Sequence, residues 1–484
     1  MMPRTMPQRS RWFTRLLLAG LVAGGLAPTG AHALTVSART SDSKLSCYKA
    51  SCTESTSIEL SAVDPVGADN DVTSRFVRDA GAPWYLEIAD ASGPVTAGTG
   101  CETQGDGTAR CAVTIRPVID ELRVNTDGSR IDLGAGNDTM HLASAGCFDA
   151  TVSGGAGNDA IVQDSGKDQS CSLIWDGGTG ADRANGSHVI VSYADRTAPV
   201  SVTAGDGAND GEAGEGDDVG AVSSITGGAG DDTIKATMRG NGSLVGGGGN
   251  DTLTGAGNID GGAGNDTLTG TSAENSIQGG TGDDVLRGNG GDDALNGGLD
   301  HDQLFGGSGD DSLSSLGSGL LDGGPGDDTF ASSYPHGPQT FSGGPGKDAW
   351  SNGYGKSVRV TLNDRADDGP RGQRDNVLGI ETVFVASGQL IGSDRSEDLR
   401  IGVGFIDGRG GDDVVRGTGL LRGGAGKDRI TVEASDRAAT TTIDARDGEQ
   451  DRVACVQRRP RQKTVTVKRI TRDANDLVLR CRAS

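Results

Sequence analysis

Aspartate recurs at a fixed spacing along this chain, within one short glycine-rich unit. From Gly279 the sequence can be cut every nine residues into GGTGDDVLR, GNGGDDALN, GGLDHDQLF and GGSGDDSLS. Each unit opens with glycine and has Asp at its sixth position and Leu at its eighth. Carboxylates, together with the backbone carbonyls of a glycine turn, are oxygen ligands that suit a hard cation such as Ca²⁺. The spacing therefore predicts a series of cation sites and explains the Asp pairs better than acid–base catalysis does.

The unit also indicates the elements that must position these carboxylates. It continues back to residue 261 without a slip, with Asn275 in the place of Asp in one copy, and separate copies lie between residues 133 and 431. Glycine permits positive φ and close approach of backbones, so positions one to six predict a turn. Positions seven to nine predict a short strand with its central apolar side chain pointing inward. A short, fixed period of this kind is typical of a solenoid.

Two units should form one coil of about 18 residues, so that aspartates of alternate units stack on one edge. Stacked strands lie roughly 4.8 Å apart, and a column of carboxylates at that spacing repels itself unless cations intervene. Calcium is favoured over magnesium, which demands tighter octahedral geometry and retains its waters. One expected column is Asp232, Asp251, Asp266, Asp284 and Asp302, and the other is Asp293, Asp311 and Asp328. The candidate metal ligands are Asp138, Asp159, Asp232, Asp251, Asp266, Asp284, Asp293, Asp302, Asp311, Asp328, Asp348, Asp413 and Asp428.

The units resemble the nonapeptide GGxGxDxUx of the hemolysin-type calcium-binding, or RTX, repeat proteins. The resemblance covers about half of the chain that follows residue 33, in separate blocks. It implies an all-β fold, a parallel β-roll or β-solenoid, with several calcium ions held between successive turns by the sixth-position Asp and by turn carbonyls. A metal-free solenoid and a disordered Gly/Asp tract are the alternatives to this interpretation.

Composition shifts divide the rest of the chain. The expected segments are a β-rich N-terminal module at 34–130, a first repeat block with an acidic spacer at 131–222, the main roll at 223–351, a second acidic spacer at 352–400, a last repeat block at 401–432 and a basic tail at 433–484. The acidic loops of the two spacers could bind calcium, although a solvated loop is the favoured interpretation. The tail is expected to form a capping hairpin, since the ends of a solenoid need covering; a basic patch for anionic cell-wall polymers is the alternative.

The first 33 residues are typical of a secretory signal peptide, with four arginines, an apolar stretch and the A-x-A site Ala31-His32-Ala33. The alternative, an uncleaved membrane anchor, needs about 20 apolar residues, more than this stretch offers. All eight cysteines follow the cleavage point, which indicates an oxidising, extracellular destination. Zinc binding is disfavoured because no C-x-x-C pair with histidine support occurs. The expected disulfides join neighbours: Cys47 with Cys52, Cys101 with Cys111, Cys147 with Cys171, and Cys455 with Cys481.

Charge and composition exclude several classes of function. The chain has 44 Lys and Arg against 67 Asp and Glu, a net charge of −23, which disfavours nucleic acid as a partner and favours cations. Glycine contributes 82 of 484 residues and aromatics only 4%, which argues against an ordinary α/β core. No segment after the signal is apolar enough to span a bilayer.

Common catalytic motifs are missing as well. No Ser has Gly at both −2 and +2, so there is no nucleophile elbow, and no H-E-x-x-H occurs. The sequence therefore predicts a secreted, non-catalytic protein whose roll folds when it binds extracellular calcium. One alternative is an adhesin or envelope protein in which the roll is a rigid spacer for a module that binds glycan or protein. A weaker alternative is a secreted hydrolase with an unrecognised site in 34–130.

Overall fold

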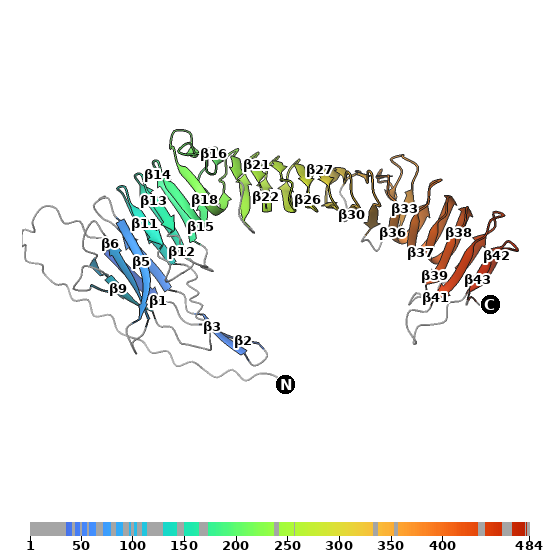
Figure 1. Cartoon of the computed structure of the whole chain (residues 1–484), viewed down its shortest axis with the longest axis horizontal. Helices are drawn as coiled ribbons and strands as arrows, with labels where there is room; N and C mark the ends of the chain where they lie inside the picture. Colours follow the sequence, from blue (N-terminus) through green and yellow to red (C-terminus); the bar gives the residue numbers. More distant parts are fainter. Residues whose placement is uncertain are drawn as a thin grey trace, which may run out of the picture.

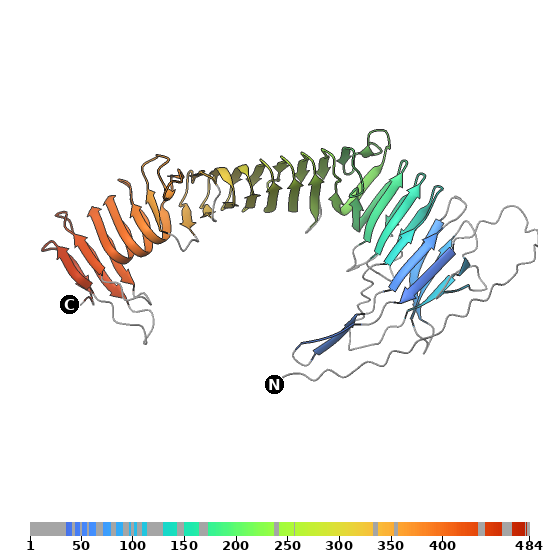
Figure 2. The same cartoon turned by 180° about the vertical axis from the view of Figure 1, so that it is seen from behind.

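The computed structural model describes backbone and side chains for residues 133–481, apart from 141–150, 163–172, 237–241, 256, 333–336, 353–356, 433–440, 457–466 and 480. Between residues 35 and 132 it describes the backbone of the strands. The described residues form strands and no α-helix, and thus no helix that could cross a membrane. They build an arched rod that is narrowest in its middle (Figure 1, and from behind in Figure 2). The expected all-β, parallel solenoid is confirmed.

The middle of the rod is a flat roll in which the chain alternates between two parallel sheets. The strands of one sheet are β18 (Asp218–Thr226), β20 (Ser243–Gly248), β22 (Gly257–Ala263), β24 (Asn275–Thr281), β26 (Ala294–Gly298), β28 (Ser312–Ser315), β30 (Thr329–Ser332) and β32 (Ala349–Asn352). Those of the other are β16 (Val200–Thr203), β19 (Thr233–Ala236), β21 (Thr252–Gly255), β23 (Thr267–Thr269), β25 (Val285–Gly290), β27 (His301–Ser308), β29 (Ser318–Asp322), β31 (Gln339–Ser342) and β35 (Asn376–Leu378).

The register of this roll has the period expected from the sequence. Leu286 pairs with Leu304 between β25 and β27, and Leu295 pairs with Leu313 between β26 and β28. Each partner is therefore two nonapeptides away, on the same sheet. All four leucines are at most 1% exposed, so the eighth-position side chains fill the space between the two sheets. Two nonapeptides make one coil.

Several coils lack one full nonapeptide turn yet keep their place in the sheet. The shortened piece before Asp322 still pairs β29 with β27, with Leu321 opposite Leu304. Leu321 is fully buried, like the eighth-position leucines of complete units. An apolar residue at the strand position is thus enough to continue the coil when the aspartate turn is missing.

The N-terminal strands are β1 (Thr35–Thr40), β2 (Lys44–Tyr48), β3 (Ser51–Ser55), β4 (Ile58–Val63), β5 (Asp71–Arg78), β6 (Trp84–Asp90), β7 (Thr96–Ala97), β8 (Cys101–Thr103) and β9 (Ala109–Val113). The first coils are β10 (Ser129–Asp132), β11 (Thr139–Leu142), β12 (Ala150–Ala156), β13 (Ala160–Gln163), β14 (Leu173–Thr179) and β15 (Arg183–Ser192). Some N-terminal strands join the sheet of the first coils (β5, β6, β8 and β9), whereas β1, β4 and β7 form one separate small sheet and β2 and β3 another. Strand β5 pairs in parallel with β11 and so covers an edge of the first coil.

The C-terminal coils correct one expectation. Their strands are β36 (Thr382–Ile391), β37 (Asp398–Gly410), β38 (Val414–Ala425), β39 (Arg429–Glu433), β40 (Thr441–Ala445), β41 (Arg452–Val456), β42 (Val467–Arg472) and β43 (Leu477–Leu479). The capping hairpin expected in the tail is wrong for the described strands, because β42 pairs in parallel with β40 and β43 in parallel with β41. Alternating strands look the same in a hairpin and in a coil, so alternation alone could not distinguish them.

One expected disulfide is confirmed and closes these last coils. Cys455, at the end of β41, is bonded to Cys481, just beyond β43, with their Cα atoms 5.1 Å apart. In the N-terminal strands the backbone register places the expected partners opposite each other, Cys47 with Cys52 and Cys101 with Cys111. The expected pair Cys147 and Cys171 and the signal segment 1–33 lie outside the described residues.

Candidate metal centre

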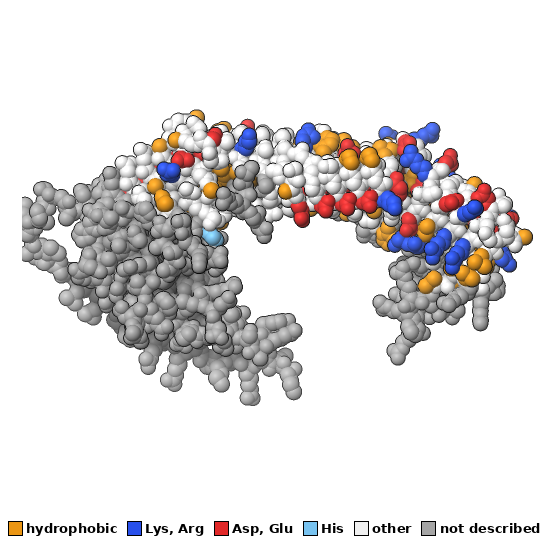
Figure 3. Space-filling view, in the orientation of Figure 1, with side chains coloured by type: hydrophobic (Ala, Val, Ile, Leu, Met, Phe, Trp, Pro, Cys, Tyr) orange, Lys and Arg blue, Asp and Glu red, His pale blue; other side chains and the backbone are white. Residues whose placement is uncertain are grey.

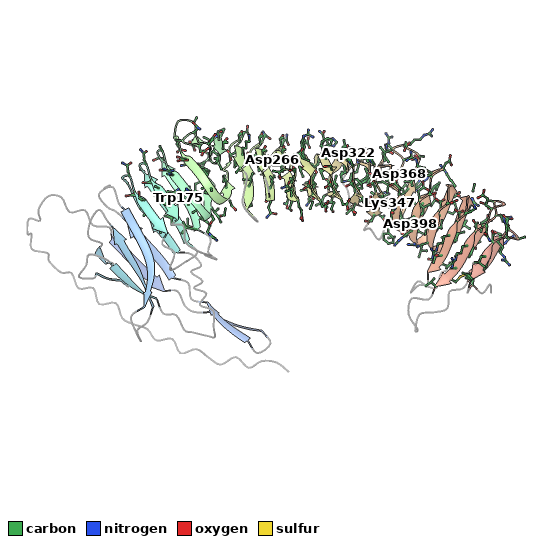
Figure 4. All side chains as sticks on the ribbon, viewed as in Figure 1. Trp175, Asp266, Asp322, Lys347, Asp368 and Asp398 are labelled. Atoms are coloured by element: carbon green, nitrogen blue, oxygen red, sulfur yellow. A yellow bond between two sulfur atoms is a disulfide. The ribbon has the colours of Figure 1, made fainter. Side chains whose placement is uncertain are left out.

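The sixth-position aspartates form columns that run from coil to coil. The backbone N–H of Asp251 donates to Oδ1 of Asp266 at 2.8 Å, and that of Asp266 donates to Oδ1 of Asp284 at 2.9 Å. The same bond joins Asp232 to Asp251 at 2.8 Å and Asp284 to Asp302 at 3.3 Å. These five aspartates stack in the order that the 18-residue period predicts. Asp266 lies near the middle of the rod (Figure 4).

The opposite edge of the roll carries a second column with the same bond. It begins with Asn275, whose N–H donates to Oδ1 of Asp293, and passes through Asp311, Asp328 and Asp348 to Glu381. The C-terminal coils hold a third column, in which Glu397, Asp413, Asp428, Asp451 and Asp476 are joined in this order. The first coils hold a fourth, made of Asp138, Asp159, Asp182 and Asp217.

Inside the columns the second carboxylate oxygen has no donor. Asp284 is 1% exposed and its Oδ1 accepts the ladder hydrogen bond, while its Oδ2 is buried without any hydrogen-bond partner. Buried polar atoms are nearly always hydrogen-bonded, so a repeated exception indicates a missing ligand. The same orphaned Oδ2 occurs in Asp182, Asp251, Asp266, Asp293, Asp311, Asp328, Asp348, Asp413, Asp428 and Asp451.

In the repeat units that open with glycine, the orphaned oxygen lies beside that first glycine. A Cβ built on Gly279 would lie 2.3 Å from Oδ2 of Asp284 and 2.4 Å from the carbonyl oxygen of Gly297, in the next coil. Gly288 stands in the same relation to Asp293 and to the carbonyl of Gly306, at 2.2 and 2.5 Å. Two oxygens therefore border one small space, and neither can donate a hydrogen to the other. The all-oxygen donor set fits a hard cation such as calcium.

Burial makes the charged form of these carboxylates unfavourable without a cation. Burial raises the pKa of Asp284 from 3.8 to about 7, against the lowering effect of the Asp266 N–H, and the carboxylates of Asp266 and Asp302 raise it further. The pKa of Asp293 is raised to about 7 for the same reason, with Asp311 as the nearest repelling charge. A bound cation supplies the positive charge that both burial and like-charge repulsion demand.

The family comparison agrees with this geometry. A model of the RTX calcium-binding nonapeptide repeat matches the chain at residues 223–236 and, in overlapping windows, from 237 to 313. The chain carries RTX calcium-binding repeats. The matched residues amount to about a fifth of the sequence and hold the first column and the start of the second. No curated protein matches the chain.

The columns extend beyond the matched RTX repeats to residues that the repeat pattern missed. These are Asp217, Asp375, Asp451 and Asp476, which all occupy ladder positions in the structure. The repeat pattern failed there because the glycines of the turn are absent or displaced. The signal that could have found them is shorter, an acidic residue two positions before a buried strand residue, as in Asp451-Arg452-Val453.

Two predicted ligands stand at column ends and differ from the rest. Oδ2 of Asp302 accepts the hydroxyl of Ser315 at 2.8 Å, and Oδ2 of Asp232 accepts the N–H of Gly228 at 2.6 Å. Asp217, at the end of the first-coil column, accepts the hydroxyl of Tyr193 at 2.9 Å. These end positions satisfy both carboxylate oxygens within the protein, so they need a cation less than the interior positions do.

The fifth-position side chains form a second ladder that the sequence did not indicate. The N–H of Asp283 donates to Oδ1 of Asn265 at 2.8 Å, and the N–H of His301 donates to Oδ1 of Asp283 at 2.9 Å. This bond runs from a coil to its predecessor, opposite in direction to the sixth-position ladder. The side chains are exposed, and acidic groups form a row along one edge of the rod (Figure 3). Fifth-position Asp and Asn side chains therefore link neighbouring coils by hydrogen bonds at the surface.

The central aspartate of each acidic spacer is buried, and both of its carboxylate oxygens accept backbone hydrogen bonds. Contrary to expectation, it is therefore not exposed to solvent, nor is it free to bind a cation. Asp210 is 1% exposed and accepts the N–H groups of Thr203 and Val219 at 2.7 and 2.8 Å. Asp368 (Figure 4) is its counterpart in the second spacer, equally buried, and accepts the N–H groups of Thr361 and Val377. Both oxygens of each carboxylate are used by the backbone, so these residues fix the spacer loops onto the coil.

Proposed function

We propose that this is a secreted, non-catalytic β-roll protein that folds on binding several calcium ions outside the cell. The observation that carries the proposal is the series of buried, orphaned Oδ2 atoms, most of which lie beside a carbonyl of the next coil where one glycine Cβ would fill the space. Asp251, Asp266, Asp284, Asp293, Asp311 and Asp328 would hold the ions in the roll, with the turn carbonyls as the other ligands.

Binding and folding are coupled in this proposal. Without a cation, self-repulsion of the columns and the conformational entropy of 82 glycines oppose the folded roll. A ligand that binds only the folded form stabilises it by about 2.7 kcal/mol per site when its free concentration is about 100 times Kd. Because one roll has several sites, its folded form should be far more stable at the high calcium concentration outside the cell than at the low concentration of the cytoplasm.

Calcium titration of the full chain tests this function. Far-UV circular dichroism in a chelator is followed while calcium, or magnesium in a parallel sample, is added. We expect β-signal to appear with calcium and not with equal magnesium. A chain that is fully folded in the chelator and indifferent to calcium would overturn the proposal and favour a metal-free spacer.

A matched pair of variants locates the response. Asp284→Asn keeps an oxygen for the ladder hydrogen bond and removes the ligand charge, while Asp283→Asn removes one charge from the exposed neighbour. We expect Asp284→Asn to lose about 1–3 kcal/mol of the stabilisation by calcium, one site's share. Asp283→Asn should keep the calcium response, so equal losses in both variants would count against a site at Asp284.

Secretion is supported by the N-terminal segment and by the disulfide between Cys455 and Cys481, which forms and persists in oxidising compartments. Mass spectrometry of protein recovered from the medium of an expressing bacterial culture should give a chain that begins at Leu34. A chain retained in cells with residues 1–33 intact would contradict this part of the proposal.

A further inference from the structure

Three carboxylates converge at the C-terminal end of the solenoid, outside the matched RTX repeats. Asp428 lies between β38 and β39, Asp451 lies one coil later before β41, and Asp447 lies in the turn between β40 and β41. One carboxylate oxygen from each residue lies within 4.8 Å of the other two. Each interior pair of a repeat column brings together two carboxylates, so this cluster has one more.

Two of the three side chains are buried, and each has one oxygen without a hydrogen-bond partner. Asp428 is 2% exposed and Asp451 is fully buried. The N–H of Asp428 donates to Oδ1 of Asp451 at 2.9 Å, and Oδ2 of each residue has no hydrogen-bond partner. A buried carboxylate oxygen without a donor is as costly here as in the repeats, and here two such side chains belong to one cluster.

The third carboxylate is held in place by backbone donors. Oδ2 of Asp447 accepts the N–H of Gly426 at 2.9 Å, and its Oδ1 accepts the N–H of Glu449 at 2.8 Å. The N–H of Asp447 itself donates to Oδ2 of Asp473 at 2.9 Å. These bonds fix the carboxylate beside the cluster without neutralising it. The nearest cation in sequence, Arg446, is engaged by Asp444 at 2.8 Å.

The sequence of this turn explains why the cluster is unlike a repeat site. In the unit RDGEQDRVA, residues 446–454, Asp451 and Val453 keep the sixth and eighth positions of the nonapeptide. Asp447 stands at the second position, where most repeat units have glycine. Burial raises the pKa of Asp428 to about 6, and the carboxylate of Asp447 raises it further, which agrees with their proximity.

We propose that Asp428, Asp447 and Asp451 form a divalent-cation site that binds calcium more tightly than the two-carboxylate sites of the repeats. The number of charged ligands is one of the properties that set calcium affinity, and calcium accepts more protein oxygens than magnesium does. The site ties the penultimate coils together close to the disulfide of Cys455 and Cys481. It goes beyond the proposed function because it needs neither the matched repeats nor their folding transition.

The test is a calorimetric titration of the full, disulfide-bonded chain with calcium chloride after removal of metal by a chelator. We expect one site that binds roughly tenfold or more tightly than the others. Asp447→Asn should abolish this tight phase and leave the weaker phase unchanged. Glu449→Gln is the matched control, since it removes an exposed acid two residues away in the same turn, and should keep both phases.

A second variant guards against a folding defect. Asp447→Gly restores the residue that the nonapeptide has at this position and should lower the tight site to the affinity of the repeat sites. Circular dichroism in saturating calcium checks that both variants keep the β-signal of the parent chain. An unchanged tight phase in both variants, or its loss in Glu449→Gln as well, would overturn the site. Loss of the weaker binding phase alone would show that the substitution acts on the repeat sites of the proposed function, and it would also overturn the assignment of Asp447 to the tight site.

Discussion

The backbone N–H of Asp266 donates a hydrogen bond to Oδ1 of Asp284, one coil further along the chain, at 2.9 Å. Oδ2 of the same Asp284 carboxylate has no donor. One side chain therefore has two separable roles, in which Oδ1 joins neighbouring coils and Oδ2 is left for a cation. Substitutions that remove one role or both should have different consequences.

Asp293→Ala and Asp293→Asn should separate these roles. Alanine leaves the N–H of Asn275 buried without an acceptor, which costs about 1–3 kcal/mol even in saturating calcium. Asparagine keeps an acceptor oxygen, so its loss of stability should appear mainly as a weaker response to calcium. Thermal unfolding of both variants in chelator and in calcium measures the difference. Equal stability of the two variants in saturating calcium would contradict it.

Acid should partly replace calcium. Because burial raises the pKa of Asp251, Asp284 and Asp328 from 3.8 to about 7, the metal-free folded roll binds protons more tightly than the unfolded chain. Their stabilisation is therefore complete below about pH 4 and is lost as the pH rises through 7. In chelator, the β-signal in far-UV circular dichroism should be stronger at pH 5 than at pH 8. A weaker β-signal at pH 5 than at pH 8 would disprove this linkage.

Filling the cation space should abolish binding without straining the backbone. The Cβ of Gly279→Ala would lie 2.3 Å from Oδ2 of Asp284, and Gly279 does not have positive φ. We expect a loss of about 1–3 kcal/mol from overpacking and the loss of that site in a calcium titration. Gly410→Ala is the control, because its Cβ would meet its nearest neighbour at an ordinary 3.5 Å. Wild-type binding by Gly279→Ala would argue against this position for the ion.

The column end at Asp302 should depend on Ser315. Because the Ser315 hydroxyl donates to Oδ2 of Asp302 at 2.8 Å, Asp302→Asn should weaken the calcium response less than Asp284→Asn. Ser315→Ala removes the donor and leaves this buried oxygen unpaired, which should lower the stability of the calcium-bound roll by about 1–3 kcal/mol. Calcium titrations of the Asp variants and unfolding curves of Ser315→Ala in saturating calcium test the two statements. The second fails if Ser315→Ala unfolds like the parent chain in saturating calcium.

The sequence predicted most of the roll and rather less of its ends. The spacing of about 18 residues placed Asp232, Asp251, Asp266, Asp284 and Asp302 in one column. The intervals between them vary by a few residues, but this variation changes the length of a turn and leaves the register of the strands unchanged. It could not show that Ser315 and Gly228 satisfy the two end carboxylates, since those contacts depend on side chains that only the folded coil brings together.

The C-terminal coils were missed for a related reason. Asp451 and Asp476 follow their predecessors by 23 and 25 residues, so they fall outside the nonapeptide period although they continue the ladder. Even so, Val453 and Val478 pair in register between β41 and β43. A search for an acidic residue followed two places later by an apolar residue, as in Asp451 and Val453 or Asp476 and Val478, would have found these coils and removed the expectation of a hairpin.

The two ladders run in opposite directions, so the two ends of the solenoid are not equivalent. If a protease cuts between two coils, the N-terminal fragment loses the acceptor for a buried sixth-position N–H, such as that of Asp266. Of the two ladders, the C-terminal fragment loses the acceptor for an exposed fifth-position N–H, such as that of Asp283, which water replaces, while strand hydrogen bonds are lost by both fragments. Erosion should therefore advance from the cut toward the N-terminus faster than toward the C-terminus. The opposed ladders make one side of every break more vulnerable than the other.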